Sequence, residues 1–124
     1  MAVLGLGVFI RAQNQAALAN WYREFLGIDI DTEYFFKNFD AVAMAKLPNS
    51  AQVLSIMASD TDYFEPSKSS FMLNLCVDNI DEVIANLEAK GVEILWRDLE
   101  NDYGKFAHIL DFESNKIELW QPPE

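Results

Sequence analysis

The sequence predicts an α+β fold, a single domain of two βαβββ modules that span residues 1–59 and 69–124. Three observations lead to this prediction. The same order of apolar patterns occurs twice: a strand, a helix followed by a glycine, and three further strands. Aligning Asn14 with Asn79 superimposes the two copies at an offset of about 65 residues. Between the copies, the polar and Pro-containing stretch 60–68 interrupts the apolar pattern and marks the boundary.

The first module begins with an expected strand at Leu4–Ala12, where small and large apolar residues alternate. A helix follows, because apolar side chains recur at helical spacing before Gly27: Ala17, Leu18, Trp21, Tyr22, Phe25 and Leu26. This periodicity indicates that the apolar face packs in the core. Three short runs rich in strand-forming residues then predict an antiparallel meander: Ile28–Phe35, Asp40–Leu47 and Gln52–Ala58.

The second module repeats the order, with an expected strand at Ser70–Val77. Four apolar residues at helical spacing predict the helix: Ile80, Val83, Ile84 and Leu87. Either Asp78 or Asn79 can cap its N-terminus, and Gly91 ends it. Three strands complete the module: Val92–Arg97, Lys105–Asp111 and Lys116–Gln121. The last two flank a short polar connection, which predicts a hairpin.

The charge of the chain excludes several partners. Twenty acidic side chains against nine basic ones give a net charge of −11, which repels nucleic acids and anionic membranes and can steer a cationic ligand. No apolar run approaches the roughly 20 residues of a membrane span, and the first residues lack the basic region of a signal peptide. We therefore expect a cytoplasmic protein.

Cys76 is the only cysteine and is expected to be a buried, inert thiol.

Glu118 is the residue that most needs an explanation. It lies between Ile117 and Leu119 in a predicted strand, and a carboxylate buried among apolar side chains is costly unless another group pairs with it. His108, the only histidine, lies on the other arm of the predicted hairpin.

Two motifs and the duplicated βαβββ order carry a resemblance to a known family. Trp21-Tyr22-Arg23-Glu24-Phe25-Leu26-Gly27 ends the first helix, and Asp111-Phe112-Glu113-Ser114-Asn115-Lys116-Ile117-Glu118-Leu119-Trp120 ends the second module. With these motifs the whole chain resembles the vicinal oxygen chelate superfamily, which includes glyoxalase I, bleomycin- and fosfomycin-resistance proteins and extradiol dioxygenases. The resemblance implies cupped sheets paired around a cavity for a small molecule, and a homodimer.

Many members of this superfamily bind a divalent metal through one residue on the first and last strand of each module. Of these positions, only Glu118 retains a ligand. The others fall at Gly7, at Met72 and near Ser55, where no acid or histidine is present. We therefore expect no firmly bound metal cofactor and leave a weak divalent metal open. Extradiol dioxygenase chemistry is excluded, because it requires two histidines and a carboxylate.

The resemblance also implies residues that line the cavity. His108, three residues before the hairpin aspartate, occupies a position that faces the cavity in fosfomycin-resistance members, so it and Glu118 are the catalytic candidates, as an acid, a base or a hydrogen-bond donor. Alternatively, His108 only compensates the charge of Glu118. Strand alternation, with Gly7 and Met72 facing inward, adds four candidates for ligand binding: Phe9, Arg11, Asn74 and Trp120.

Three functions remain open. The first is a glyoxalase-family enzyme, a lyase or isomerase, that uses Glu118 and His108. The second is a metal-free protein that binds a drug or metabolite, like the bleomycin-resistance proteins, and the net charge favours it. The third is a structural or regulatory domain without a small ligand.

Overall fold

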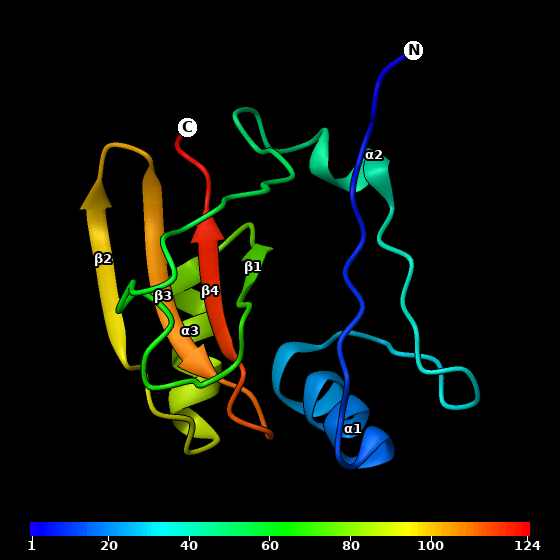
Figure 1. Cartoon of the computed structure of the whole chain (residues 1–124). Helices are drawn as coiled ribbons and strands as arrows, with labels where there is room; N and C mark the ends of the chain where they lie inside the picture. The colour runs from blue at the N-terminus through cyan, green and yellow to red at the C-terminus, as the bar shows by residue number, and fades with distance from the viewer.

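The computed structural model describes residues 1–124 and places every strand in the second half of the chain (Figure 1). The helices are α1 (Gln15–Leu26), α2 (Ala41–Met44) and α3 (Ile80–Ala89). The strands are β1 (Leu73–Cys76), β2 (Trp96–Asn101), β3 (Gly104–Leu110) and β4 (Lys116–Gln121). The α+β class predicted from the sequence is therefore confirmed.

The strands form one mixed sheet in the order β1-β4-β3-β2. β1 runs parallel to β4, whereas β3 is antiparallel to both of its neighbours. A parallel pair requires a crossover connection, and α3 lies within the connection that leaves β1. The second half of the chain thus has the βαβββ order that the sequence predicts.

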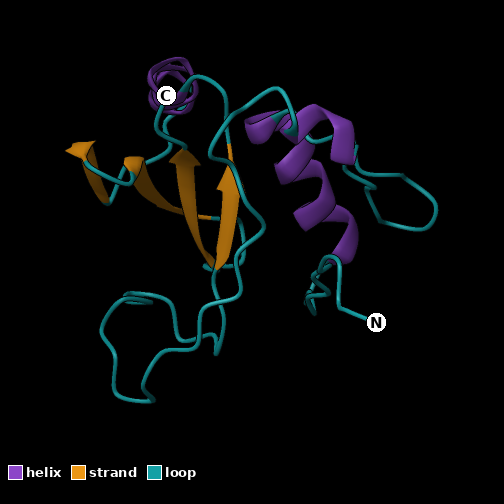
Figure 2. Ribbon diagram, turned by 90° about the horizontal axis from the view of Figure 1, so that it is seen from above, coloured by secondary structure: helices purple, strands orange, loops and turns teal.

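The two faces of the sheet are covered differently. α3 lies behind the sheet in Figure 1, and the green segment that precedes β1 passes in front of it. The view from above separates α3 from these loops on opposite sides of the strands (Figure 2). We call residues 58–69 the linker. The face of the sheet in front of which the linker passes is called the loop face.

The core lies between the helices and the face of the sheet opposite the loop face. It contains ten buried apolar residues, contributed by α1, α3, β3 and β4: Leu18, Trp21, Tyr22, Ile80, Ile84, Leu87, Ala107, Ile109, Ile117 and Leu119. Asn79 caps α3 by accepting a hydrogen bond from the Glu82 amide at 3.2 Å. Gly27 ends α1 with a φ of 65°, a left-handed conformation that glycine adopts at little cost.

The two sequence motifs contact each other and join the halves of the chain. The Tyr22 hydroxyl donates to Asp111 Oδ2 at 2.7 Å within the buried interface. Glu113 accepts hydrogen bonds from the amides of Gln13 (2.7 Å) and Asn14 (2.9 Å), just before α1. Burial and the Asp111 carboxylate raise the pKa of Tyr22, so its hydroxyl stays protonated and continues to donate. The hairpin turn therefore fastens α1 to the sheet.

The first module differs from the prediction. Its helix is present as α1, but none of its four expected strands forms, and α2 occupies part of Asp40–Leu47. The N-terminal segment and the segment around Gln52 share no backbone–backbone hydrogen bond, and the Leu6 amide donates to the Gln52 side chain at 3.0 Å. Alternating apolar residues form a strand only where another backbone pairs with them, and within one chain these segments have no such partner.

Candidate ligand-binding site

Four side chains form one row across the sheet, one from each strand. The strand registers align Asn74 of β1 with Glu118 of β4, Glu118 with His108 of β3, and His108 with Trp96 of β2. Directly opposed residues in paired strands point to the same side of a sheet. Because Ile117 and Leu119 point into the core beneath α3, this cross-strand row points to the loop face.

Glu118 is the centre of the row and receives three hydrogen bonds. His108 Nε2 lies 2.8 Å from Glu118 Oε2, and Asn74 Nδ2 donates to Glu118 Oε1 at 2.8 Å. The hydroxyl of Tyr63, from the linker, also donates to Oε2. Glu118 is 8% exposed and His108 is 3% exposed. The structure thus brings the two catalytic candidates into direct contact.

The hydrogen bonds keep Glu118 ionised although it is buried. Burial by itself raises the pKa of this carboxyl, but the donors His108, Tyr63 and Asn74 outweigh burial and hold the pKa below its ordinary value. An ionised carboxylate only accepts hydrogen bonds, so the neighbouring Nε2 of the histidine carries a proton. Burial, together with the bond to Glu118, raises the pKa of Tyr63, so this phenol also remains a donor.

Aromatic side chains surround the histidine on the loop face. The ring of Tyr63 meets the His108 ring edge-on, with centroids 5.1 Å apart and an interplanar angle of 86°. The ring centroid of Trp96 lies 4.6 Å from that of His108, with the two rings tilted by 49°, and Trp96 is 44% exposed. The Lys116 ammonium lies 5.5 Å from the centroid of the Tyr63 ring. An aromatic wall beside a few oriented polar groups is typical of small-molecule sites.

The donors on this face do not fit a metal centre. No group of three His, Cys, Asp or Glu side chains is placed to hold an ion. Glu118 and His108 are the two groups in the row with a carboxylate or imidazole donor, and each is engaged by the other. A metal ion needs several such ligands at one point.

The other ligand-binding candidates have mixed positions. Asn74 lies in the row, and Trp120 lies on the same face of β4, two residues after Glu118, where its indole donates to the Tyr103 carbonyl at 2.9 Å. Phe9 and Arg11 lie on the unpaired N-terminal segment, outside the sheet that carries the row, and both are exposed. Their role in ligand binding stays a prediction. The alternation of side chains along a strand predicts that both residues line the cavity, but this prediction assumes that the N-terminal segment pairs in a sheet.

Sequence reasoning missed Tyr63, Trp96 and Lys116. Tyr63 lies within the polar stretch that was interpreted as a boundary, and an aromatic residue among turn-forming residues was the available signal. Trp96 becomes visible only when the register of β2 and β3 is known.

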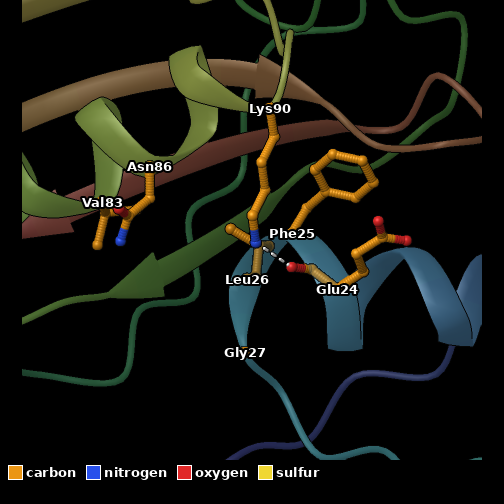
Figure 3. A pocket seen from close by; sticks show the side chains of 7 residues that line it. All are labelled: Glu24, Phe25, Leu26, Gly27, Val83, Asn86 and Lys90. Carbon is orange, nitrogen blue, oxygen red and sulfur yellow. Dashed lines mark hydrogen bonds between the residues drawn. The ribbon is translucent and has the colours of Figure 1, made fainter.

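A separate hollow of about 220 Å³ lies between the end of α1 and α3 (Figure 3). Lys90 crosses it and donates to the Glu24 carbonyl, at the C-terminal end of α1, while its ammonium lies 5.8 Å from the Phe25 ring centroid. Lysine at a helix C-terminus satisfies a free carbonyl and interacts favourably with the helix dipole. This contact explains the hollow as helix packing, on the side of the sheet away from the cross-strand row.

The fold and the site define an α+β protein with a polar, aromatic-lined face on a βαβββ sheet. The model of the Glyoxalase/Bleomycin resistance protein/Dioxygenase superfamily matches residues 6–119. The chain therefore belongs to this superfamily, and the resemblance drawn from the two motifs is confirmed. No helix is both long and apolar enough to cross a membrane.

A solved structure of similar length shows the same fold. TnmS3, an antibiotic binding protein from Streptomyces sp. CB03234, is 21% identical over 99% of both chains, with a TM-score of 0.58. A glyoxalase family protein from Bacillus anthracis is 24% identical, with a TM-score of 0.40. That match covers 51% of this chain and 50% of the Bacillus protein, so it spans about half the length of that protein. No curated protein matches the chain with significance.

Proposed function

We propose that this chain is a cytoplasmic, metal-free small-molecule-binding protein whose ligand contacts the cross-strand row. The buried, ionised Glu118 carries the proposal. Apolar residues of similar volume often stabilise a fold as well as a buried charge with its partners, so the buried carboxylate and its contact with His108 point to a role beyond folding. TnmS3, which has the same fold, is described as an antibiotic binding protein, and ligand binding is extended to this chain as part of the proposal.

Thermal unfolding with bleomycin, a cationic antibiotic, tests this function. A ligand that binds only the native state raises its stability, by about 2.7 kcal/mol at 100 times the dissociation constant. Bleomycin should raise the melting temperature of the wild type and leave that of Glu118→Gln unchanged. Glu93→Gln, which removes the same charge at an exposed position, is the matched control and should respond like the wild type. Equal stabilisation of both variants would contradict binding at the row.

Elemental analysis tests the metal-free part of the proposal. The purified protein should contain far less than one zinc, nickel or manganese ion per chain, because Gly7, Met72 and Ser55 supply no strong ligand beside Glu118. A stoichiometric metal that Glu118→Gln removes would contradict it.

The 2.8 Å contact between His108 and Glu118 favours a lyase or isomerase as the second candidate. A histidine oriented by a carboxylate can transfer protons near neutral pH. The lowered pKa of Glu118 argues against it as the base, because such a carboxylate binds a proton weakly. Turnover of a glutathione hemithioacetal that is lost in Glu118→Gln and retained in Glu93→Gln would establish the enzyme instead.

We also propose that two copies of the chain associate. Apolar side chains on the N-terminal segment and on the segment near Gln52 are largely exposed, among them Leu4 (95%), Phe9 (101%) and Ile56 (91%). These segments show the strand pattern but lack backbone partners, and an exposed apolar strand pairs readily with another chain. A second copy supplies the same unpaired segments, which makes a symmetric interface self-complementary. Light scattering after size-exclusion chromatography should give twice the mass of one chain, and a monomer would contradict the proposal.

A further inference from the structure

Tyr63 differs from the other groups that contact Glu118. His108 and Asn74 lie on strands whose backbones pair with β4 at Glu118 itself, so their side chains belong to the same sheet as the carboxylate. Tyr63 comes from the linker, 55 residues away in the sequence, and its hydroxyl has Glu118 as its hydrogen-bond partner. It is therefore the one donor on this carboxylate that comes from outside the sheet.

The linker backbone is anchored independently of the tyrosine hydroxyl. The Lys116 ammonium donates to the Tyr63 carbonyl, and the Tyr63 amide donates to the Thr61 hydroxyl at 3.2 Å. Further along, the Ser69 hydroxyl donates to Asn115 Oδ1 at 2.9 Å. Because these contacts hold the backbone, the Tyr63 side chain can rotate away from the row by changing its rotamer, without opening the linker.

The position of the Tyr63 side chain is that of a bound phenol. Its hydroxyl donates to a buried carboxylate, its ring meets the His108 ring edge-on, and the Lys116 ammonium lies 5.5 Å from its centroid. Each contact uses a property of an aryl hydroxyl group: an acidic O–H, the quadrupole of the ring in a T-shaped pair, or the negative ring face that attracts a cation. The row is therefore complementary to an aromatic ring that carries a hydroxyl.

We propose that Tyr63 is a built-in competitor for the ligand, and that the ligand is an aromatic hydroxyl compound whose O–H replaces the Tyr63 hydroxyl on Glu118. This inference rests on the proposed function, since it assigns a chemical class to the ligand of the same site. A tethered competitor acts at an effective concentration in the millimolar range or above, so a ligand must outbind it to enter. Tyr63 thereby makes the site selective, because a compound that fills the ring position without donating a hydrogen bond cannot replace the lost contact.

The test uses p-cresol, which is the tyrosine side chain as a free molecule, and toluene, which lacks the hydroxyl. Both are titrated into the full chain while NMR follows the His108 ring. In Tyr63→Ala, p-cresol should bind in the millimolar range and shift the His108 signals, and it should bind the wild type about tenfold more weakly because the competitor is present. Toluene should bind Tyr63→Ala more weakly than p-cresol does.

Two further variants locate the effect. In Tyr63→Ala/Glu118→Gln the preference for p-cresol over toluene should fall, because the charged acceptor is gone. Tyr63→Phe keeps the ring but loses its hydrogen bond to Glu118, so p-cresol should bind this variant more tightly than it binds the wild type. If Tyr63→Ala does not fold, Tyr63→Phe replaces it in the titrations. Equal affinity of p-cresol for the wild type and both single variants, with shifts at His108, would overturn the role of Tyr63 and leave the ligand site standing. An absence of His108 shifts in every variant would overturn both.

Discussion

Replacing Glu118 with Gln should destabilise the fold in a pH-dependent manner. The carboxylate accepts hydrogen bonds from His108, Asn74 and Tyr63, and bonds to a charged group contribute about 1.5–3 kcal/mol each. Glutamine keeps one acceptor oxygen and turns the other into an NH₂ group that faces a donor. We therefore expect a loss of about 2–3 kcal/mol at pH 7, less than the sum of the bonds because one donor at least stays satisfied. A loss of this size lowers the melting temperature by roughly 10 °C.

The pH dependence follows from the lowered pKa of Glu118. A carboxyl whose pKa is lower in the folded state than in the unfolded chain stabilises the fold above the unfolded value, which is near 4.3 for Glu. That stabilisation disappears as the pH falls through the folded pKa. The difference between wild type and Glu118→Gln should thus be full above about pH 5 and shrink as the solution becomes more acidic.

Urea unfolding of the wild type, Glu118→Gln and Glu93→Gln at several pH values measures this difference. Glu93→Gln should stay within about 0.5 kcal/mol of the wild type, because the side chain is exposed. A Glu118→Gln variant as stable as the wild type at pH 7, or one whose deficit is the same in acid, would refute the reasoning that the carboxylate is ionised and held by its donors.

Three further predictions concern the core, the junction of the halves and the exposed segments. Leu87→Ala should lower the free energy of unfolding by about 2–5 kcal/mol in denaturant unfolding, because Leu87 of α3 is fully buried in the core. A loss below 1 kcal/mol would contradict this packing. Tyr22→Phe should cost about 1–2 kcal/mol through the lost bond to Asp111, whose Oδ2 keeps the Asn115 side-chain donor; unchanged stability would show that the bond contributes nothing. Phe9→Ser should convert the proposed dimer to a monomer on size-exclusion chromatography while the far-UV circular dichroism is retained, and a variant that elutes like the wild-type dimer would exclude this segment from the interface.

Local patterns in the sequence determined α1, α3 and the order of elements in the second module, although β2 begins at Trp96 rather than at the expected Val92. Helical periodicity, the cap at Asn79 and the glycine at position 27 act within a few residues, so α1 and α3 were predicted close to their observed bounds. The hairpin of β3 and β4 is also local, since its strands are joined by a short polar turn. It brought Glu118 opposite His108, and a carboxylate in an apolar strand required such a partner.

The tertiary structure alone decided which other groups reach Glu118. Tyr63 and Asn74 meet it across 55 and 44 residues of sequence, and no local pattern encodes contacts at that separation. The strands expected in the first module failed for the same reason. Periodicity records which face of a segment is apolar, but a strand also needs a backbone partner, and the partner is set by the whole fold or by a second chain. A helix satisfies its own hydrogen bonds, which is why the same half of the sequence predicted α1 correctly and its strands incorrectly.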